Sequence, residues 1–252
     1  MVEEGLPEAE ARRRFFLVNR GGLLHAERPD LSPGQRVYAG PLDERFRPPG
    51  TDATAPIGLA EVVRAVQPTI LIGLSTVGGA FSESIVREMA AHVDRPIVLP
   101  LSNPTARSEA VPEDLMRWTD GRALIATGSP FPPVDVGGRP LPIAQCNNVY
   151  VFPAIGLGVR ASRARRVSDR MILAAARALG DLAPIAHDPA GSLLPPVADL
   201  REVARTIAFA VGTAAMSDGV APYQSPDELR NRIRASQWVP EYPRYAVDPG
   251  TT

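Results

Sequence analysis

Three short apolar runs, each followed by residues that can bind a ligand, constrain the fold of this chain more than any other feature. The runs cover residues 69–74, 96–101 and 123–126, and helical patterns at 82–92 and 112–118 separate them. Continuous apolar strands that alternate with helices are typical of a parallel sheet that is covered on both faces. The sequence therefore predicts a doubly wound α/β fold.

The other elements are predicted from periodicity, helix caps and the positions of glycine and proline. They are a helix over 8–14, a strand over 15–19, a long loop over 26–56, and helices over 57–66, 168–179 (with Gly180 as its stop) and 197–216. Residues 222–252 are rich in proline and aromatic side chains. We therefore expect a domain over 1–221 and a C-terminal arm over 222–252.

Charge and hydropathy exclude several classes of protein. The net charge is −1 and no basic stripe alternates with aromatic residues, which argues against a nucleic-acid partner. No run approaches the roughly 20 apolar residues that cross a bilayer, and the acidic segment 1–10 does not resemble a signal peptide. The single cysteine, Cys146, fits a reducing compartment. These observations predict a cytoplasmic protein without a membrane partner.

The basic residues limit the chemistry that this chain can perform. All 27 are arginine, and arginine cannot act as a general base because it stays protonated. The histidines, His25, His92 and His187, are far apart in sequence and show no metal-ligand spacing. No Gly-x-Gly-x-x-Gly motif follows a strand, and Cys146 has no histidine or arginine near it in sequence, so we interpret it as a small packed residue.

Three segments contain candidate binding residues. Gly73–Gly79 lies between a strand and a helix, where backbone amides can approach a cofactor, although glycines after a strand more often form a simple turn. Asn103 follows the strand at 96–101 and could donate to a carboxylate or a carboxamide, or form an Asn-Pro turn. Asn147 and Asn148 form a second uncharged donor pair before an apolar run that is predicted to be a strand, and a turn at the entry to that strand explains the pair equally.

Five blocks in this order resemble the nucleotide-binding half of malic enzymes, which oxidatively decarboxylate malate to pyruvate. The resemblance extends over about residues 8–223. The blocks are Phe15–Asn19 with Gly22–Leu23, Gly73–Ser75 with Gly78–Phe81, Leu101–Thr105, Gly128–Phe131, and Asn147–Pro153 with Ile155–Gly158.

The resemblance implies roles for individual residues. Asn103 would lie where the nicotinamide meets the substrate, and Asn147 or Asn148 would donate to a malate carboxylate. Uncharged donors suit an anionic substrate because they avoid the burial of another charge. The residues expected to border the cofactor are Asn19, Arg20, Gly73, Ser75, Gly78, Gly79 and Asn103.

The end of the strand at 15–19 bears on the choice of cofactor. Members of the family usually have Asp there, whereas this chain has Asn19 followed by Arg20. An acidic residue favours NAD and a nearby arginine accommodates the 2′-phosphate of NADP. The cofactor is therefore expected to be NAD or NADP, with a lean towards NADP.

The family's catalytic tyrosine and lysine, and its Mg²⁺ or Mn²⁺ ligands, precede the first glycine turn of the nucleotide-binding fold. This chain resembles the family only after that turn, so we expect an N-terminally truncated Rossmann-like sheet without its first strand, and no catalytic or metal-binding residues. Three hypotheses follow: an inactive fragment of a malic enzyme, one half of a split enzyme, or a non-catalytic dinucleotide-binding or interaction domain. Members of the family are usually homo-oligomers.

Overall fold

The computed structural model describes residues 1–47, 52 and 55–242. The chain divides into two compact units, Met1–Cys146 and Asn147–Thr252. The boundary that we expect at 221–222 therefore falls within the second unit, and the expected arm contains a helix, α9 (Pro226–Ser236). Residues 243–252 of that arm lie outside the described part of the chain.

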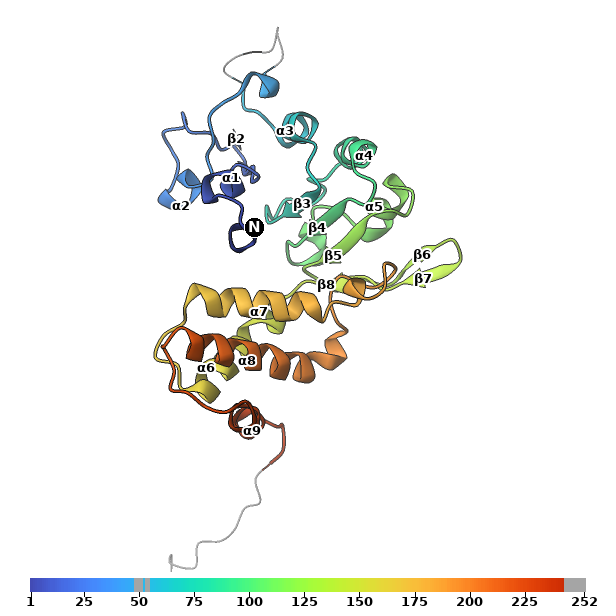
Figure 1. Ribbon diagram of the computed structural model, residues 1–252. Coiled ribbons are helices and arrows are strands. Elements are labelled where there is room, and N and C mark those ends of the chain that lie inside the picture. Colours follow the sequence, from blue (N-terminus) through green and yellow to red (C-terminus); the bar gives the residue numbers. More distant parts are fainter. Residues whose placement is uncertain (48–51, 53–54, 243–252) are drawn as a thin grey trace, which may run out of the picture. The chain divides into compact units, whose positions relative to one another are not determined.

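A four-stranded parallel sheet forms the centre of the first unit (Figure 1). Its strands lie in the order β3 (Ile70–Gly73), β4 (Ile97–Pro100), β5 (Leu124–Thr127) and β8 (Ala144–Gln145). Each neighbouring pair is parallel. The predicted α/β class and its three main strands are confirmed, and β8 is an additional strand.

Three helices pack together with one face of this sheet: α3 (Leu59–Val66), α4 (Glu83–His92) and α5 (Pro112–Trp118). The core between them contains Leu71, Val98 and Ile125, one residue from each of β3, β4 and β5. Alternation along a strand places Ile70 and Ile72 on the opposite face, where they are 49% and 52% exposed.

The N-terminal segment differs from the prediction. Helix α1 covers Glu8–Arg12, and only Val18–Asn19 of the predicted strand is extended, as β1. Strand β1 pairs antiparallel with β2 (Gly22–Leu23) and with no strand of the four-stranded sheet. The chain reverses at Arg20–Gly21, and Gly22, the first residue of β2, has a φ of 90°, a conformation that suits glycine.

The region predicted as a long loop contains two short helical turns. Helix α2 (Pro33–Arg36) begins at Ser32, whose capping box with Gln35 outweighs the high content of proline and glycine nearby. A 3-10 turn covers Glu44–Phe46, and Phe46 is buried beside Leu23 and Val62. Residues 48–51 and 53–54 lie outside the described residues.

A short antiparallel hairpin, β6 (Val134–Val136) with β7 (Arg139–Leu141), lies between β5 and β8 and was not predicted. Its turn is Gly137–Gly138, and both residues have positive φ. A Gly-Gly pair between two short alternating segments is a known hairpin signal. The sequence therefore does carry a signal for this hairpin, although its two strands have only three residues each.

The second unit is helical. Its main helices are α6 (Phe152–Ser162), α7 (Asp169–Asp181), α8 (Leu200–Ser217) and α9 (Pro226–Ser236), and 3-10 turns cover Asn148–Tyr150, Pro184–Ala186 and Val197–Asp199. The strand predicted after Asn147 and Asn148 is wrong, because a 3-10 turn and α6 occupy those residues. Pro153 lies in the first turn of α6, where its missing N–H costs no hydrogen bond.

The helices of the second unit pack closely around small residues. A Cβ at Gly158 of α6 would lie 2.8 Å from the Ala208 carbonyl oxygen of α8, so glycine permits this close approach. Helix α9 buries Leu229 and Ile233 in a cluster with Ala161 and Ala208. The predicted stop at Gly180 is wrong by two residues, since α7 continues to Asp181 and its C-cap is Leu182.

Among the described residues, none of the helices has the length and apolarity required to span a bilayer.

Candidate functional site

Three loops meet at the carboxyl edge of the sheet, where open parallel sheets place their ligands. The Thr76 N–H, in the loop after β3, donates to Ser102 Oγ in the loop after β4 at 2.9 Å. The Ser129 hydroxyl, after β5, donates to the amide oxygen of Asn103. The structure thus brings together the predicted Gly73–Gly79 and Asn103 segments, which lie apart in sequence.

Asn103 has donors available for a ligand. Its side-chain oxygen accepts the Ser129 hydroxyl, and its amide nitrogen has no hydrogen-bond partner among the described residues. The residue is exposed, at the end of the strand that carries it. The bond from Ser129 fixes the orientation of the amide, so that the two N–H groups remain for a carbonyl or carboxylate oxygen.

Ser75 uses its donors within the protein. Its backbone N–H and its hydroxyl each donate to Oε1 of Glu109 at 2.8 Å. Ser75 can therefore border a cofactor, but it has no donor left for one. Glu109, which is buried, is the main residue of this region that sequence reasoning missed; its only signal is a charged residue beside the apolar pair Ala110–Val111.

The predicted glycines have structural reasons to be glycine. A Cβ at Gly73 would lie 2.5 Å from Cδ of Glu109, and a Cβ at Gly78 would lie 2.9 Å from the carbonyl oxygen of Ala106. Gly79 has a φ of 73°, and its N–H donates to the Ser108 carbonyl at 3.2 Å. These residues shape the loop after β3 against the segment that contains Glu109.

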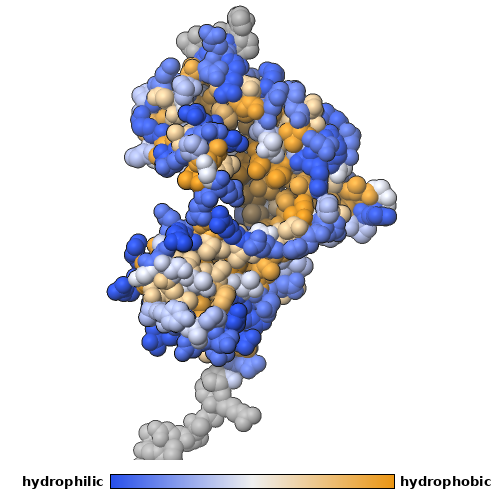
Figure 2. Space-filling model, viewed as in Figure 1, coloured by the Kyte–Doolittle hydropathy of each residue, from blue (hydrophilic) through white to orange (hydrophobic). Residues whose placement is uncertain are grey.

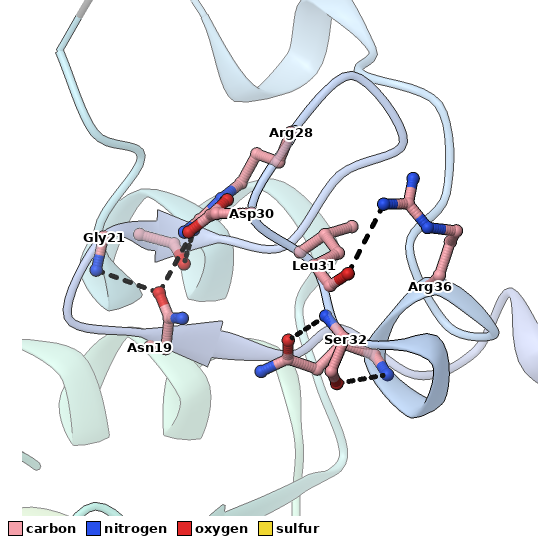
Figure 3. Close-up of polar contacts among 9 residues, drawn as sticks. Asn19, Gly21, Arg28, Asp30, Leu31, Ser32 and Arg36 are labelled. Carbon is pink, nitrogen blue, oxygen red and sulfur yellow. Dashed lines mark hydrogen bonds and ion pairs between the residues drawn. The ribbon is translucent and has the colours of Figure 1, made fainter.

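Asn19 and Arg20, which are predicted to border the cofactor, lie in the β1–β2 hairpin, and Figure 3 shows the contacts of Asn19. The side-chain oxygen of Asn19 accepts the Gly21 N–H at 2.9 Å and an N–H of Arg28 at 3.1 Å. Arg28 also pairs with Asp30, with Nη2 and Oδ2 2.5 Å apart, and this hydrogen bond lowers the pKa of Asp30. Sequence reasoning did not single out the Arg28–Asp30 pair. Arg20, which it predicts to border the cofactor, is exposed.

Asn147 and Asn148 belong to the second unit. The side-chain oxygen of Asn147 accepts the Val149 N–H at 3.0 Å and caps the 3-10 turn, which leaves its amide N–H groups as donors. Asn148 is exposed. Both side chains keep the donors that their predicted role requires.

Cys146 is partly buried, and its N–H donates to the Thr127 carbonyl at 2.8 Å. Burial raises the pKa of the thiol above its ordinary value, which supports the interpretation of Cys146 as a packed, protonated residue.

We expect the folded chain to react with an aromatic disulfide reagent at pH 7.5 about tenfold more slowly than the same chain in 6 M urea, because less thiolate is present and access is restricted. The release of the coloured thiolate measures the rate at the single cysteine. Equal rates in the two states, after correction for the effect of urea on free cysteine, would contradict this assignment.

No group of three or more His, Cys, Asp or Glu side chains that could hold a metal ion occurs in the part of the chain that the structure describes.

A parallel sheet with ligand-competent loops at its carboxyl edge defines a Rossmann-like α/β domain. The sequence model of one family, "Malic enzyme, NAD binding domain", matches residues 1–216. The chain belongs to this family.

The chain is similar to bacterial proteins named NAD-dependent malic enzyme. It is 51% identical over 246 residues to the protein from Edwardsiella ictaluri and 47% identical over 245 residues to that from Pseudomonas aeruginosa. Both alignments cover 97% of this chain and 43% of the relative. The chain thus spans less than half the length of the relatives that it matches.

Two solved structures resemble the fold. The malic enzyme of Entamoeba histolytica matches with a TM-score of 0.63 and 24% identity, over 87% of this chain and 41% of that one. The malic enzyme of Pyrococcus horikoshii matches with a TM-score of 0.54 and 24% identity, over 77% and 42%. At this level of identity the likeness supports the fold alone.

Proposed function

We propose that this chain is the dinucleotide-binding portion of a malic enzyme. The observation that carries the proposal is the exposed amide of Asn103, which is held by Ser129 at the carboxyl edge of the sheet with both N–H donors available. In this role Asn103 donates to the nicotinamide carboxamide or to the substrate beside it. NAD, when bound, supplies the hydride acceptor; the chain binds and orients it.

We propose NAD as the cofactor. The relatives are named NAD-dependent malic enzymes. The lean towards NADP rests on Asn19 and Arg20. The guanidinium that donates to Asn19 is that of Arg28, and it is already paired with Asp30. Arg20 is then the candidate for binding a 2′-phosphate, so the ratio of NADH to NADPH affinity in an Arg20→Ala variant tests the choice.

The substrate pair in the complete enzyme is malate and pyruvate, and Asn147 or Asn148 is the proposed donor to a malate carboxylate. The base, the metal ligands and the lysine of the family are proposed to come from chain outside these 252 residues. That chain is either a longer version of this protein or a separate subunit. The non-catalytic binding domain is the remaining alternative. A cytoplasmic homo-oligomer is proposed for the complete enzyme.

We expect the 252-residue chain to bind NADH and to show no malate-dependent reduction of NAD when Mn²⁺ is present. Asn103→Asp keeps the acceptor for Ser129 but removes both N–H donors. It should therefore weaken NADH binding by about tenfold, the effect of losing one or two hydrogen bonds. NADH fluorescence measures the affinity, and absorbance at 340 nm measures turnover.

Asn148→Ala serves as the matched amide control, because its side chain is assigned to malate rather than to the cofactor. Unchanged NADH affinity in Asn103→Asp would contradict the role of Asn103. Turnover above the blank would contradict the assignment of the chemistry to residues outside this chain, and wild-type chain that binds neither NADH nor NADPH would contradict the proposed function itself.

A further inference from the structure

Glu109 is a buried acidic residue to which the proposed function assigns no role. It lies between the 3-10 turn Thr105–Arg107 and helix α5, and its side chain is 0% exposed. A buried carboxylate is costly unless hydrogen bonds satisfy it. The way in which this one is satisfied determines the shape of the carboxyl edge.

The Glu109 carboxylate accepts four hydrogen bonds from two different loops. Oε1 accepts the N–H and the hydroxyl of Ser75 at 2.8 Å each, and the hydroxyl of Ser102 at 2.5 Å. Oε2 accepts the Ser102 N–H at 3.3 Å. Ser75 follows β3 and Ser102 follows β4, so a single side chain connects the ends of two neighbouring strands.

The surroundings are adapted to this carboxylate. Any side chain at Gly73 would collide with it, since a Cβ there would lie within 2.7 Å of its Cγ, Cδ and Oε2. Ser102 Oγ also accepts the Thr76 N–H at 2.9 Å, which extends the connection to Thr76. The backbone carbonyl of Glu109 accepts the Phe81 N–H at 3.0 Å, at the far end of the same loop.

No ion pair of Glu109 occurs among the described residues, and the nearby guanidinium of Arg107 donates to the Thr76 carbonyl. Burial acts to raise the pKa of Glu109, but the hydrogen bonds from Ser102 and Ser75 outweigh it and hold the pKa below its ordinary value. The residue is therefore ionised at neutral pH, and neutral donors alone stabilise its charge.

We propose that Glu109 is a positioning residue that fixes the loops after β3 and β4 relative to each other and thereby sets the place of Asn103. Ser102, which it binds through both N–H and hydroxyl, directly precedes Asn103. The consequence for cofactor binding rests on the proposed function, whereas the coupling of the loops does not. Glu109 itself contacts neither cofactor nor substrate in this role.

Hydrogen–deuterium exchange on the whole chain tests the coupling. Glu109→Gln keeps one acceptor oxygen but turns an N–H group towards the Ser102 N–H, where two donors oppose each other. We expect exchange in both segments, 74–79 and 101–105, to rise between about tenfold and a hundredfold, as for lost bonds to a charged group. Strand β5 and helix α4 should keep wild-type rates. Exchange that stays at wild-type rates in either segment would overturn the proposal.

Glu113→Gln is the matched control, because it removes the same charge from an exposed position four residues away. It should leave both segments unchanged, and an equal rise there would overturn the proposal. If Glu109→Gln unfolds the first unit, so that β5 also exchanges rapidly, Ser102→Ala decides instead. It keeps the carboxylate, its bonds from Ser75 and its bond from the Ser102 N–H, and removes both bonds of the Ser102 hydroxyl, the one to Glu109 and the one from the Thr76 N–H. Exchange at 74–77 should therefore rise; unchanged exchange there would overturn the proposal.

Two further readouts separate positioning from a general structural role. The amide shifts of Ser75 and Ser102 should titrate together with one midpoint, below the roughly 4.3 of an ordinary glutamate; separate midpoints would overturn the coupling. NADH affinity should fall about tenfold in Glu109→Gln and stay unchanged in Glu113→Gln. Wild-type chain that binds no NADH would overturn the proposed function while the exchange result still decides the coupling.

Discussion

Replacing Gly128 with alanine is expected to destabilise the first unit by about 3 kcal/mol or more, because the added methyl group would meet backbone rather than a movable side chain. A Cβ at Gly128 would lie 2.1 Å from the carbonyl oxygen of Leu101 and 2.7 Å from its carbonyl carbon. The collision forces apart the ends of β4 and β5. The free energy of unfolding in urea measures the effect.

Tryptophan fluorescence can report on this unit alone. Trp118 packs against the core of the first unit, whereas Trp238, in the second, is 76% exposed. A Trp238→Phe background therefore leaves one reporter in the right place. Gly34→Ala is the matched control, because nothing lies within 4 Å of the added Cβ and its φ is ordinary; it should change stability by less than about 1 kcal/mol. Equal stabilities of the two variants would contradict the prediction.

The second large effect is expected at β3. Its outer edge pairs with no strand in the described part of the chain, and Ile70, Ile72 and Leu74 are 49%, 52% and 75% exposed. Hydrophobic residues, in orange, gather over this part of the first unit in Figure 2. Unpaired strand edges with apolar side chains self-associate. We expect the chain to form concentration-dependent oligomers or aggregates.

Ile72→Lys should weaken that association by about tenfold or more, since a charge on the strand opposes both pairing and apolar contact. Light scattering over a range of concentrations measures it. Val37→Lys, which alters an exposed valine outside the sheet, is the control and should have little effect. A wild-type chain that stays monomeric, with a sharp thermal transition, would contradict the expectation.

The fold class and the central elements could be predicted because their signals are local. Helix α5 has the predicted bounds, since Pro112 with Glu113 and Asp114 marks its start, and the apolar runs at β3, β4 and β5 have no competing interpretation. The segment 15–19 was misassigned because a strand is defined by its partner. Its apolar run suits a sheet, but the chain turns back at Arg20–Gly21 after only two paired residues.

The residues after Asn148 were also misassigned, because their local sequence is compatible with more than one structure. Val149–Phe152 is apolar enough for a strand or a buried helix, and Pro153 fits the start of a helix as well as the end of a strand. Packing decides between them: Tyr150 is buried with its hydroxyl 2.5 Å from the Pro195 carbonyl oxygen, and Gly158 lets α6 approach α8. Both partners are about 45 or more residues away along the chain.

The sequence by itself determined that this is an α/β chain of the malic enzyme family, with Asn103 at the end of a strand and without a lysine, because residue identities and short-range periodicity carry that information. Only the tertiary structure decided what Glu109 does. Its carboxylate has no partner near it in sequence except Ser102. Its positioning role also requires Ser75, which lies 34 residues away and reaches it only when the parallel strands align their carboxyl ends.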